Sequence, residues 1–379
     1  MDINPLGAYH PHVIHARLFG AVLGALVLAG CSQGSPTTTT GASSSNAATT
    51  APSSASASSP AAAVPAKFAG GGVKISLVRQ LSSGDYFEQW LAGAQAEAKA
   101  LNVTLDVSSG DGNNDKQALN LEQAIGQKPD AIIVDHGFAE TVQPTIKKAV
   151  AAGIPLVAYD VDPGSPEAVA LTQDDHQIAG QALDALKADT GGKADVVYVY
   201  VAGFAPLDRR NETWTQFKKD NPGVKQVAQI GVVNNSTAAA VADQAKAALT
   251  ANPGVKAVFA PYDEFAKGAT LAIKELGLQD KVKVYGADVS TADIGVMTEP
   301  RSPWVATSAA DASNVGRIAV RAAALLVAGQ PVDHALKVPP ALITQKQLHD
   351  GGIASVQQLT QAVPALQTPD VARVPWVAP

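Results

Sequence analysis

Two aspartates that follow apolar runs of the chain could bind hydroxyl groups. Asp160 ends the run PLVAYD, and Asp288 ends the run VKVYGAD. A carboxylate accepts hydrogen bonds on both oxygens, which suits two neighbouring hydroxyl groups, as in a vicinal diol. Charge-assisted bonds of this kind also discriminate against a ligand that lacks the hydroxyl. A solvated strand-end carboxylate or a helix N-cap is the alternative for each aspartate.

A second acidic segment partly matches a calcium-binding loop. Asp111, Asn113, Asp115 and Glu122 stand at positions 1, 3, 5 and 12 of that pattern. Position 6, where a glycine makes the sharp turn, is Lys116. A strand-to-helix loop with Asp115 near the helix start accounts for the same residues. We therefore expect no metal ion, and calcium here is the alternative.

Enzyme motifs are absent from the part of the sequence that is expected to fold. The seven histidines show no metal-ligand spacing, and neither G-x-S-x-G nor H-E-x-x-H occurs within residues 73–379. We therefore expect no cofactor and no enzymatic activity.

The composition is that of an ordinary globular protein with weak charge. The chain has 379 residues, of which 46% are hydrophobic and 16% charged, and the formal net charge is −6. This length is enough for about two domains. Nucleic-acid binding depends on clustered Lys and Arg, so nucleic acid is not expected as a partner.

The single cysteine, Cys31, ends a short apolar segment. Residues 18–28 are apolar or small, follow Arg17, and are too few to span a bilayer as a helix. The segment has the length of a signal-peptide core, and the final LAGC resembles a lipobox, the bacterial signal for lipidation of a cysteine. We predict that residues 1–31 are a signal peptide, that Cys31 is lipidated, and that the protein is anchored to the membrane outside the cytoplasm.

The segment after Cys31 has a composition that does not support folding. From Ser32 to Ala66 it is almost wholly Ser, Thr, Ala, Pro and Gly, with Val64 as its one large aliphatic residue. Such a segment cannot bury enough apolar surface to offset the entropy of ordering. We predict a disordered stalk over residues 32–71.

From Val73 onward, short β-branched runs alternate with longer amphipathic segments. In the first half we expect strands at 73–78, 131–134 and 155–159, and helices at 86–100, 118–125 and 142–151. In the second half we expect strands at 196–201, 227–233, 257–260 and 282–288, and helices at 178–186, 238–249 and 266–276, with another through 214–217. Strands that alternate with helices predict an α/β fold of two similar, doubly wound parallel-sheet lobes. Ligands of such sheets bind outside the carboxyl ends of the strands, so we expect a site between the lobes.

Several stretches together resemble the ribose-binding-type periplasmic binding proteins, which in turn resemble the ligand cores of LacI-type repressors. They are GAQAEAKALNVTLDV, QKPDAIIVD with KKAVAAGIPLVAYD, and TANPGVKAVFAPYDEFAKGATLAIKELG with VKVYGADVS. The resemblance covers about residues 73–345. It implies a type I periplasmic binding protein fold with three crossovers between lobes, near Gln173, Ala310 and Val338.

The resemblance also implies domain boundaries. The N-terminal lobe would comprise residues 72–173 plus 311–337, and the C-terminal lobe 174–310 plus 338–350. Residues 351–379 would be a C-terminal extension.

On the same resemblance we expect a set of ligand-binding residues: Asp85, Tyr86, Phe87, Asp135, Asp160, Arg210, Trp214, Tyr262, Asp263 and Asp288. Phe87 would stack on an apolar face of a sugar ring, whereas Trp90 is expected in the core. Family members place a ligand-contacting arginine near Arg209 and Arg210, and we favour Arg210. Helix capping is the alternative for Asp263.

Two positions depart from the ribose-binding pattern. Val161 replaces an arginine after the strand-end aspartate, and Ala310 replaces a glutamine near the second crossover. Ribose is therefore disfavoured, and another sugar, a linear polyol or a furanose signal is open. Arg79, Asp85, Asp135 and His136 are candidates for substitute contacts.

The resemblance and the lipobox together predict the solute-binding lipoprotein of an ABC importer. It would be a monomer that closes its lobes on a small polyhydroxylated ligand and delivers it to a membrane permease. The alternative is a receptor subunit that presents the liganded form to a membrane signalling protein.

Overall fold

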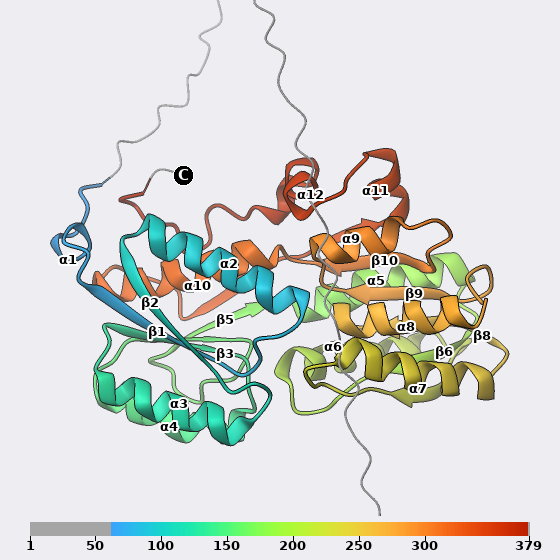
Figure 1. Cartoon of the computed structure of the whole chain (residues 1–379), viewed down its shortest axis with the longest axis horizontal. Coiled ribbons are helices and arrows are strands. Elements are labelled where there is room, and N and C mark those ends of the chain that lie inside the picture. The colour runs from blue at the N-terminus through green and yellow to red at the C-terminus, as the bar shows by residue number, and fades with distance from the viewer. Residues whose placement is uncertain (1–61, 378–379) are drawn as a thin grey trace, which may run out of the picture. The chain divides into compact units, whose positions relative to one another are not determined.

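The computed structural model describes residues 62–377. The predicted signal peptide, Cys31 and the stalk up to residue 61 lie outside the described residues. The remaining chain folds into two lobes, each built on one six-stranded sheet (Figure 1).

The first lobe has an entirely parallel sheet. Its strands are β1 (Val73–Arg79), β2 (Val103–Ser109), β3 (Ala131–Asp135), β4 (Leu156–Tyr159), β5 (Val169–Gln173) and β11 (Ala335–Val338). They lie in the order β11-β5-β4-β3-β1-β2. In the register, Ile75 of β1 is opposite Leu105 of β2 on one side and Ala131 of β3 on the other. Every residue of β3 is buried, because helices cover both faces of the sheet.

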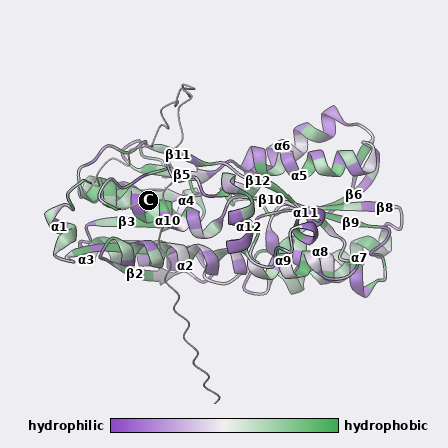
Figure 2. Cartoon of the chain, turned by 90° about the horizontal axis from the view of Figure 1, so that it is seen from above, coloured by the Kyte–Doolittle hydropathy of each residue, from purple (hydrophilic) through white to green (hydrophobic). Residues whose placement is uncertain are grey.

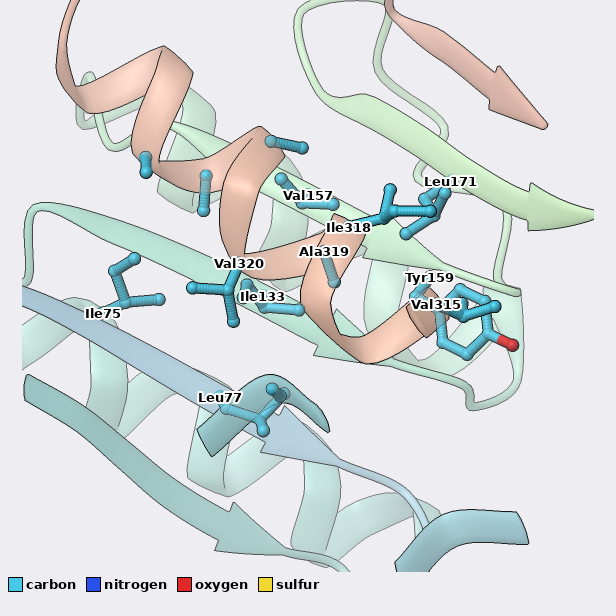
Figure 3. Packing of buried hydrophobic residues seen from close by; sticks show 14 of the residues in the cluster. Ile75, Leu77, Ile133, Val157, Tyr159, Leu171, Val315, Ile318, Ala319 and Val320 are labelled. Atoms are coloured by element: carbon cyan, nitrogen blue, oxygen red, sulfur yellow. The ribbon is translucent and has the colours of Figure 1, made fainter. Parts of the chain in front are cut away.

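Four helices cover this sheet: α2 (Asp85–Ala100), α3 (Asn114–Gln127), α4 (Ala139–Ala151) and α10 (Ala312–Val327). α2 and α10 pack together on one face, and α3 and α4 on the other. Figure 3 shows Val315, Ile318 and Val320 of α10 beside sheet residues such as Ile133 and Val157.

Helices α2 and α10 touch through their backbones at two glycines. A Cβ on Gly93 would lie 1.9 Å from the carbonyl oxygen of Ser313, and a Cβ on Gly316 would lie 2.1 Å from that of Trp90. Only glycine allows this approach. Trp90 is fully buried here, as expected from the sequence.

The second lobe repeats the arrangement with one change. Its strands are β6 (Ala194–Val199), β7 (Val224–Ile230), β8 (Val255–Ala260), β9 (Lys283–Ala287), β10 (Trp304–Ala309) and β12 (Ala341–Thr344). They lie in the order β12-β10-β9-β8-β6-β7, and β12 is antiparallel to β10. The prediction of two doubly wound lobes is confirmed.

The helices of this lobe are α5 (Asp175–Thr190), α6 (Ala205–Asp220), α7 (Thr237–Ala251), α8 (Asp263–Glu275), α9 (Thr291–Thr298) and α11 (Gln345–Asp350). α5 and α6 cover one face of the sheet, and α7 and α8 cover the other. Figure 2 shows hydrophilic and hydrophobic residues mixed along outer helices such as α6 and α7, as expected where one helix face is buried.

The chain passes between the lobes three times, as the fold class predicted. The crossings run from β5 to α5, from β10 to α10, and from β11 to β12. A C-terminal segment then makes a further connection. Helix α12 (Val356–Ala362) and the 3-10 turn η1 (Pro364–Leu366) pack on the second lobe, and Val374 and Trp376 pack in the core of the first.

The folded region begins earlier than the sequence suggested. Helix α1 (Ala66–Ala69) places Phe68 in the first-lobe core, with its ring centroid 5.3 Å from that of Trp376. The stalk predicted over residues 32–71 therefore extends too far at its C-terminal end. None of the helices within residues 62–377 is both long and apolar enough to span a membrane.

Candidate ligand-binding site

A cleft lies where the carboxyl ends of the two sheets face each other. It is lined from the first lobe by Leu81, Tyr86, Phe87, His136 and Gln173, and from the second by Phe204, Pro206, Leu207, Arg210, Val233, Tyr262 and Asp288.

Asp160 and Asp288 adopt the same backbone arrangement in their two lobes. Asp160 follows β4 with φ +49°, and Asp288 follows β9 with φ +68°. Their N–H groups donate to the neighbouring strand, at Leu171 (3.0 Å) and Ser308 (2.9 Å). A non-glycine residue in this left-handed region is strained, and such strain is concentrated at functional sites.

Arg210 is fixed in the cleft by Asp288. Its Nη1 and Nη2 donate to the two oxygens of Asp288 at 2.9 and 3.2 Å. Its Nε donates to Asp175, and Nη1 also donates to the carbonyl of Pro261. These bonds use four of the five N–H groups of a guanidinium, so one N–H is left for a ligand. Burial alone would lower the pKa of Arg210, but Asp288 and Asp175 raise it above its usual value, and Arg210 stays charged.

Arg209 joins the two lobes beside this pair. Its Nη2 donates to Asp160 of the first lobe at 2.7 Å, and its Nε donates to Asp175 of the second at 2.8 Å. Asp160 also accepts a long bond of 3.5 Å from Gln173. Both arginines are thus occupied by carboxylates. Among the described residues that line the cleft, Arg210 is the one with a permanent positive charge, so the site favours a neutral ligand over a phosphate.

The first lobe presents polar side chains at one side of the cleft and apolar ones at the other. Across the strand order β5-β4-β3-β1, the side chains at the strand ends are Gln173, Asp160, His136 and Leu81.

The second lobe shows the same order. Across β9-β8-β6-β7, the residues are Asp288, then Tyr262, then Phe204 with Leu207, then Val233. The two sheets therefore face each other with a hydrogen-bonding half near β4 and β9 and an apolar half near β1, β6 and β7.

The structure places half of the predicted ligand-binding residues on the cleft wall. Tyr86, Phe87, Arg210, Tyr262 and Asp288 line it. Phe87 and Tyr262 come from opposite lobes, with their ring centroids 6.5 Å apart. The hydroxyl of Tyr86 is hydrogen-bonded to that of Tyr159. These rings offer flat apolar surfaces of the kind that stack on sugars.

The remaining predicted residues do not line the cleft. Asp160 lies behind the wall, held by Arg209, and Asp135 lies behind His136. Asp85 forms an ion pair with Lys267 of the other lobe at 2.5 Å.

Two of the predicted residues are in the interior of the second lobe. Asp263 is the first residue of α8 and accepts the N–H of Glu264 at 2.8 Å. Burial, and then the charge of Asp293, raise the pKa of Asp263 well above its usual value. Trp214 is fully buried in the core, where its Nε1 donates to Gln226.

Sequence reasoning missed the apolar half of the cleft. Phe204, Pro206 and Leu207 lie at the start of α6, and Val233 and Leu81 lie in loops just after β7 and β1. Their position just after predicted strands is a sequence signal for lining the cleft. The signal is weak, because apolar residues at a helix start usually pack in the core.

The acidic segment from Asp111 to Glu122 holds internal partners. Asn113 caps α3 by accepting the N–H of Lys116 at 2.9 Å, and Lys116 pairs with Asp111. Glu122 pairs with Lys148. Within residues 62–377 no group of three or more His, Cys, Asp or Glu side chains is arranged to hold a metal.

The fold and the cleft define a two-lobed solute-binding protein, and the chain belongs to the periplasmic binding protein domain family. The family match covers residues 75–331, more than half of the chain. Proteins of this family bind solutes outside the cytoplasm and are not enzymes as a class.

Individual relatives are sugar-binding proteins. The ribose import binding protein of Bacillus subtilis is 25% identical over 266 residues, which cover 69% of this chain and 84% of the relative. A solved structure of the 5-methylthioribose transporter solute-binding protein of Thermotoga lettingae, in complex with 5-methylthioribose, is 44% identical. The match has a TM-score of 0.76 and covers 78% of this chain and 93% of the Thermotoga chain. A solved structure of a sugar ABC transporter protein of Yersinia enterocolitica is 29% identical, with a TM-score of 0.80. The match covers 84% of this chain and 97% of the other.

Proposed function

We propose that this protein captures a ribose derivative with an apolar 5-substituent, of which 5-methylthioribose is the model, for import by an ABC transporter. The observation that carries the proposal is the division of the cleft into a hydrogen-bonding half and an apolar half. In 5-methylthioribose a methylthio group replaces the 5-hydroxyl of ribose, so the molecule is divided in the same way.

The polar half would bind the ring hydroxyls. Asp288 keeps acceptor capacity beyond its arginine partner, and Arg210 has one N–H to donate. The rings of Phe87 and Tyr262 would cover the faces of the sugar.

The apolar half would bind the substituent. Leu81, Phe204, Leu207 and Val233 offer it no hydrogen-bonding side chain. The 5-hydroxyl of ribose would therefore be desolvated without a partner, at a cost of about 1–3 kcal/mol, whereas a methylthio group gains about 0.8 kcal/mol per buried carbon. We expect 5-methylthioribose to bind at least about tenfold more tightly than ribose.

The wider assembly is part of the proposal. The lobes would comprise residues 72–173 plus 311–337 and 174–310 plus 338–350, with 351–379 as an extension. The protein would act as a monomer, anchored to the membrane through lipid on Cys31, and would deliver its ligand to a permease. The LAGC motif and the composition of the following segment support the anchor.

The test is calorimetric titration with 5-methylthioribose and ribose on wild type and on Val233→Thr. This change keeps the branched shape of the side chain but replaces one methyl group in the apolar half by a hydroxyl. We expect it to weaken 5-methylthioribose binding by about threefold to tenfold, because the new hydroxyl lacks a partner once the ligand excludes water. Ribose binding should change less.

Val232→Thr is the matched control. Val232 precedes Val233, packs against the second-lobe core and does not line the cleft. Its substitution should leave the ratio of the two dissociation constants unchanged. Equal or tighter binding of ribose by wild type would contradict the proposed ligand class.

A further inference from the structure

His136 occupies the place after β3 that Asp160 and Asp288 occupy after β4 and β9. Its φ is +60°, close to theirs. Its N–H donates at 2.8 Å to the carbonyl of Tyr159 on the neighbouring strand, as the N–H groups of the two aspartates do on theirs. The same backbone device therefore directs a third strand-end side chain to the edge of the sheet where the cleft lies.

The surroundings hold the strained backbone of His136 in place. The side-chain nitrogen of Gln117 donates to the carbonyl of His136 at 3.0 Å. Gly137 follows with φ +118°, and a Cβ there would lie 2.4 Å from Gln117 Oε1. Because histidine has a Cβ, a positive φ is strained for it. The conformation therefore persists only because the neighbouring residues hold it in place.

The ring of His136 is oriented by a buried ion pair. Nδ1 lies 2.6 Å from Asp135 Oδ1, and Arg79 Nε donates to Asp135 Oδ2 at 2.8 Å. Phe87 and Tyr159 contact the ring edge-on, with centroids 5.0 and 5.1 Å away. The imidazole thus has little freedom to rotate.

The ion pair also decides which ring nitrogen carries the proton. Burial raises the pKa of Asp135, but the charge of Arg79 and the hydrogen bond from His136 outweigh it and hold that pKa below its usual value. An ionised carboxylate can only accept, so Nδ1 is the donor. Nε2 of the neutral ring is then an acceptor. Within residues 62–377 it has no hydrogen-bond partner, although the side chain lines the cleft.

We infer that His136 is a ligand-binding residue, whose Nε2 accepts a hydrogen bond from a ring hydroxyl of the sugar, and that Asp135 and Arg79 are its positioning residues. The inference deepens the proposed function and rests on it for the class of ligand. It identifies a second acceptor beside Asp288, and so a requirement for a second hydroxyl donor.

The first measurement is the ¹⁵N spectrum of the His136 imidazole, assigned with His136→Asn. The apo protein should show the tautomer with the proton on Nδ1. Saturation with 5-methylthioribose, or with ribose if ribose binds more tightly, should move the Nε2 resonance toward that of a hydrogen-bonded acceptor. A proton on Nε2 in the apo protein, or an Nε2 signal that saturation leaves in place, would overturn the inference.

The second measurement is a cycle between protein and ligand variants. Asparagine tolerates the left-handed backbone but has no atom at the position of Nε2. His136→Asn should weaken binding of the tighter sugar about tenfold. Binding of the 2-deoxy and 3-deoxy forms of this sugar is then measured with both proteins. In wild type, removal of a hydroxyl that contacts His136 should weaken binding. In His136→Asn, removal of that same hydroxyl should have almost no further effect.

The cycle separates a binding role from a structural one. A misfolded site would weaken all analogues alike, whereas a lost hydroxyl contact affects one of them. His176→Asn, on the exposed side of α5, is the control and should leave every constant unchanged. The inference would be contradicted if removal of either hydroxyl weakened binding to His136→Asn as much as it weakens binding to wild type. Tighter binding of ribose together with the expected cycle would overturn the proposed ligand but not the role of His136.

Discussion

Individual residues at strand ends carry much of the chemistry of this protein. Asp160 and Asp288 combine a left-handed backbone with a carboxylate, and the arginines Arg209 and Arg210 hold these carboxylates in place. A buried ion pair is favourable only if its charged groups make most of their hydrogen bonds, and four of the five N–H groups of Arg210 do so here. Asp288 is thereby held at the cleft wall, and Asp160 is held behind it.

Buried carboxyl groups outside the cleft make folding sensitive to pH. Burial raises the pKa of Asp293 to about 6, against the opposing charge of Lys267, which lies 3.9 Å away. A raised pKa in the folded state means that folding favours the protonated form. The contribution of Asp293 to stability is therefore fully present below about pH 4, and it is lost as the pH rises through about 6.

Asp293→Asn should remove the loss of stability that wild type shows as the pH rises through about 6. Asparagine can still accept the N–H of Ser290 in the capping box of α9. Between pH 4 and pH 7 the free energy of unfolding of the variant should rise relative to wild type by up to roughly 3 kcal/mol. Urea unfolding at several pH values measures this difference.

Asp280→Asn is a control, because the contribution of Asp280 to stability has the opposite pH dependence. A hydrogen bond from Arg301 lowers the pKa of Asp280 in the folded protein, so its contribution is present above about pH 4 and is lost as the pH falls. Parallel pH curves for Asp293→Asn and wild type would show that Asp293 does not titrate as described.

At the scale of elements, the starts of two helices connect the lobes. Asp85, the first residue of α2, pairs with Lys267 of α8, and its N–H lies 3.4 Å from Glu264 Oε1. Nearby, Ser83 Oγ is 3.2 Å from Asn235 Oδ1. These contacts join opposite lobes, so they contribute to closure rather than to the stability of either lobe.

Asp85→Asn should speed ligand release. A partly exposed ion pair contributes about 0.5–1 kcal/mol, so the dissociation constant should rise about twofold to fivefold, mainly through the dissociation rate. Stopped-flow fluorescence with 5-methylthioribose measures this rate. Asp115→Asn changes the same residue type in the first turn of α3 and should have no effect. An unchanged rate in Asp85→Asn would show that the pair does not stabilise the closed form.

At the scale of the whole molecule, the C-terminal segment adds a connection to the three crossovers. Asn314 donates to the carbonyls of Leu366 and Gln367 and to the hydroxyl of Thr368, which fixes the segment to the start of α10. Beyond this point Trp376 packs on Phe68, and Ala62 donates to the carbonyl of Pro375 at 2.8 Å. The two ends of the described chain thus meet on the first lobe.

Trp376→Ala should destabilise the protein. Trp376 is 6% exposed, and truncation of a buried tryptophan costs about 3–5 kcal/mol. The melting temperature should fall by several degrees in thermal unfolding. Arg373→Ala, at an exposed position of the same segment, should change it little. Equal melting temperatures for Trp376→Ala and wild type would mean that the segment is not part of the cooperative fold.

Much of the fold could be predicted from sequence because buried parallel strands form continuous apolar runs. The expected strand at 131–134 and helix at 86–100 agree with β3 and α2 to within one residue. The edge strand β7 begins and ends three residues before the predicted range 227–233, since its residues are half-exposed and lack that pattern. Helix α10 was not predicted, although its sequence is amphipathic: Arg317 and Arg321, four residues apart, mark a partly exposed face opposite the buried apolar one.

The site was less predictable because contacts between distant segments define it. Trp214 follows Arg210 by one helical turn, yet Arg210 lines the cleft and Trp214 lies in the core. One turn advances about 5.4 Å along the helix, enough to leave the sheet edge for its interior. Asp85 has a carboxylate like Asp288, but its partner is a lysine of the other lobe.

The sequence alone determined the alternation of strands and helices, the family and the two strand-end aspartates, since these depend on local apolar runs and on residue order. Only the tertiary structure decided which side chains share the cleft. The opposition of two sheets brings Leu81, Phe204 and Val233 together from three loops. The same packing orients His136 through Asp135 and Arg79, 56 residues apart in sequence. Such contacts depend on long-range packing, which no local pattern encodes.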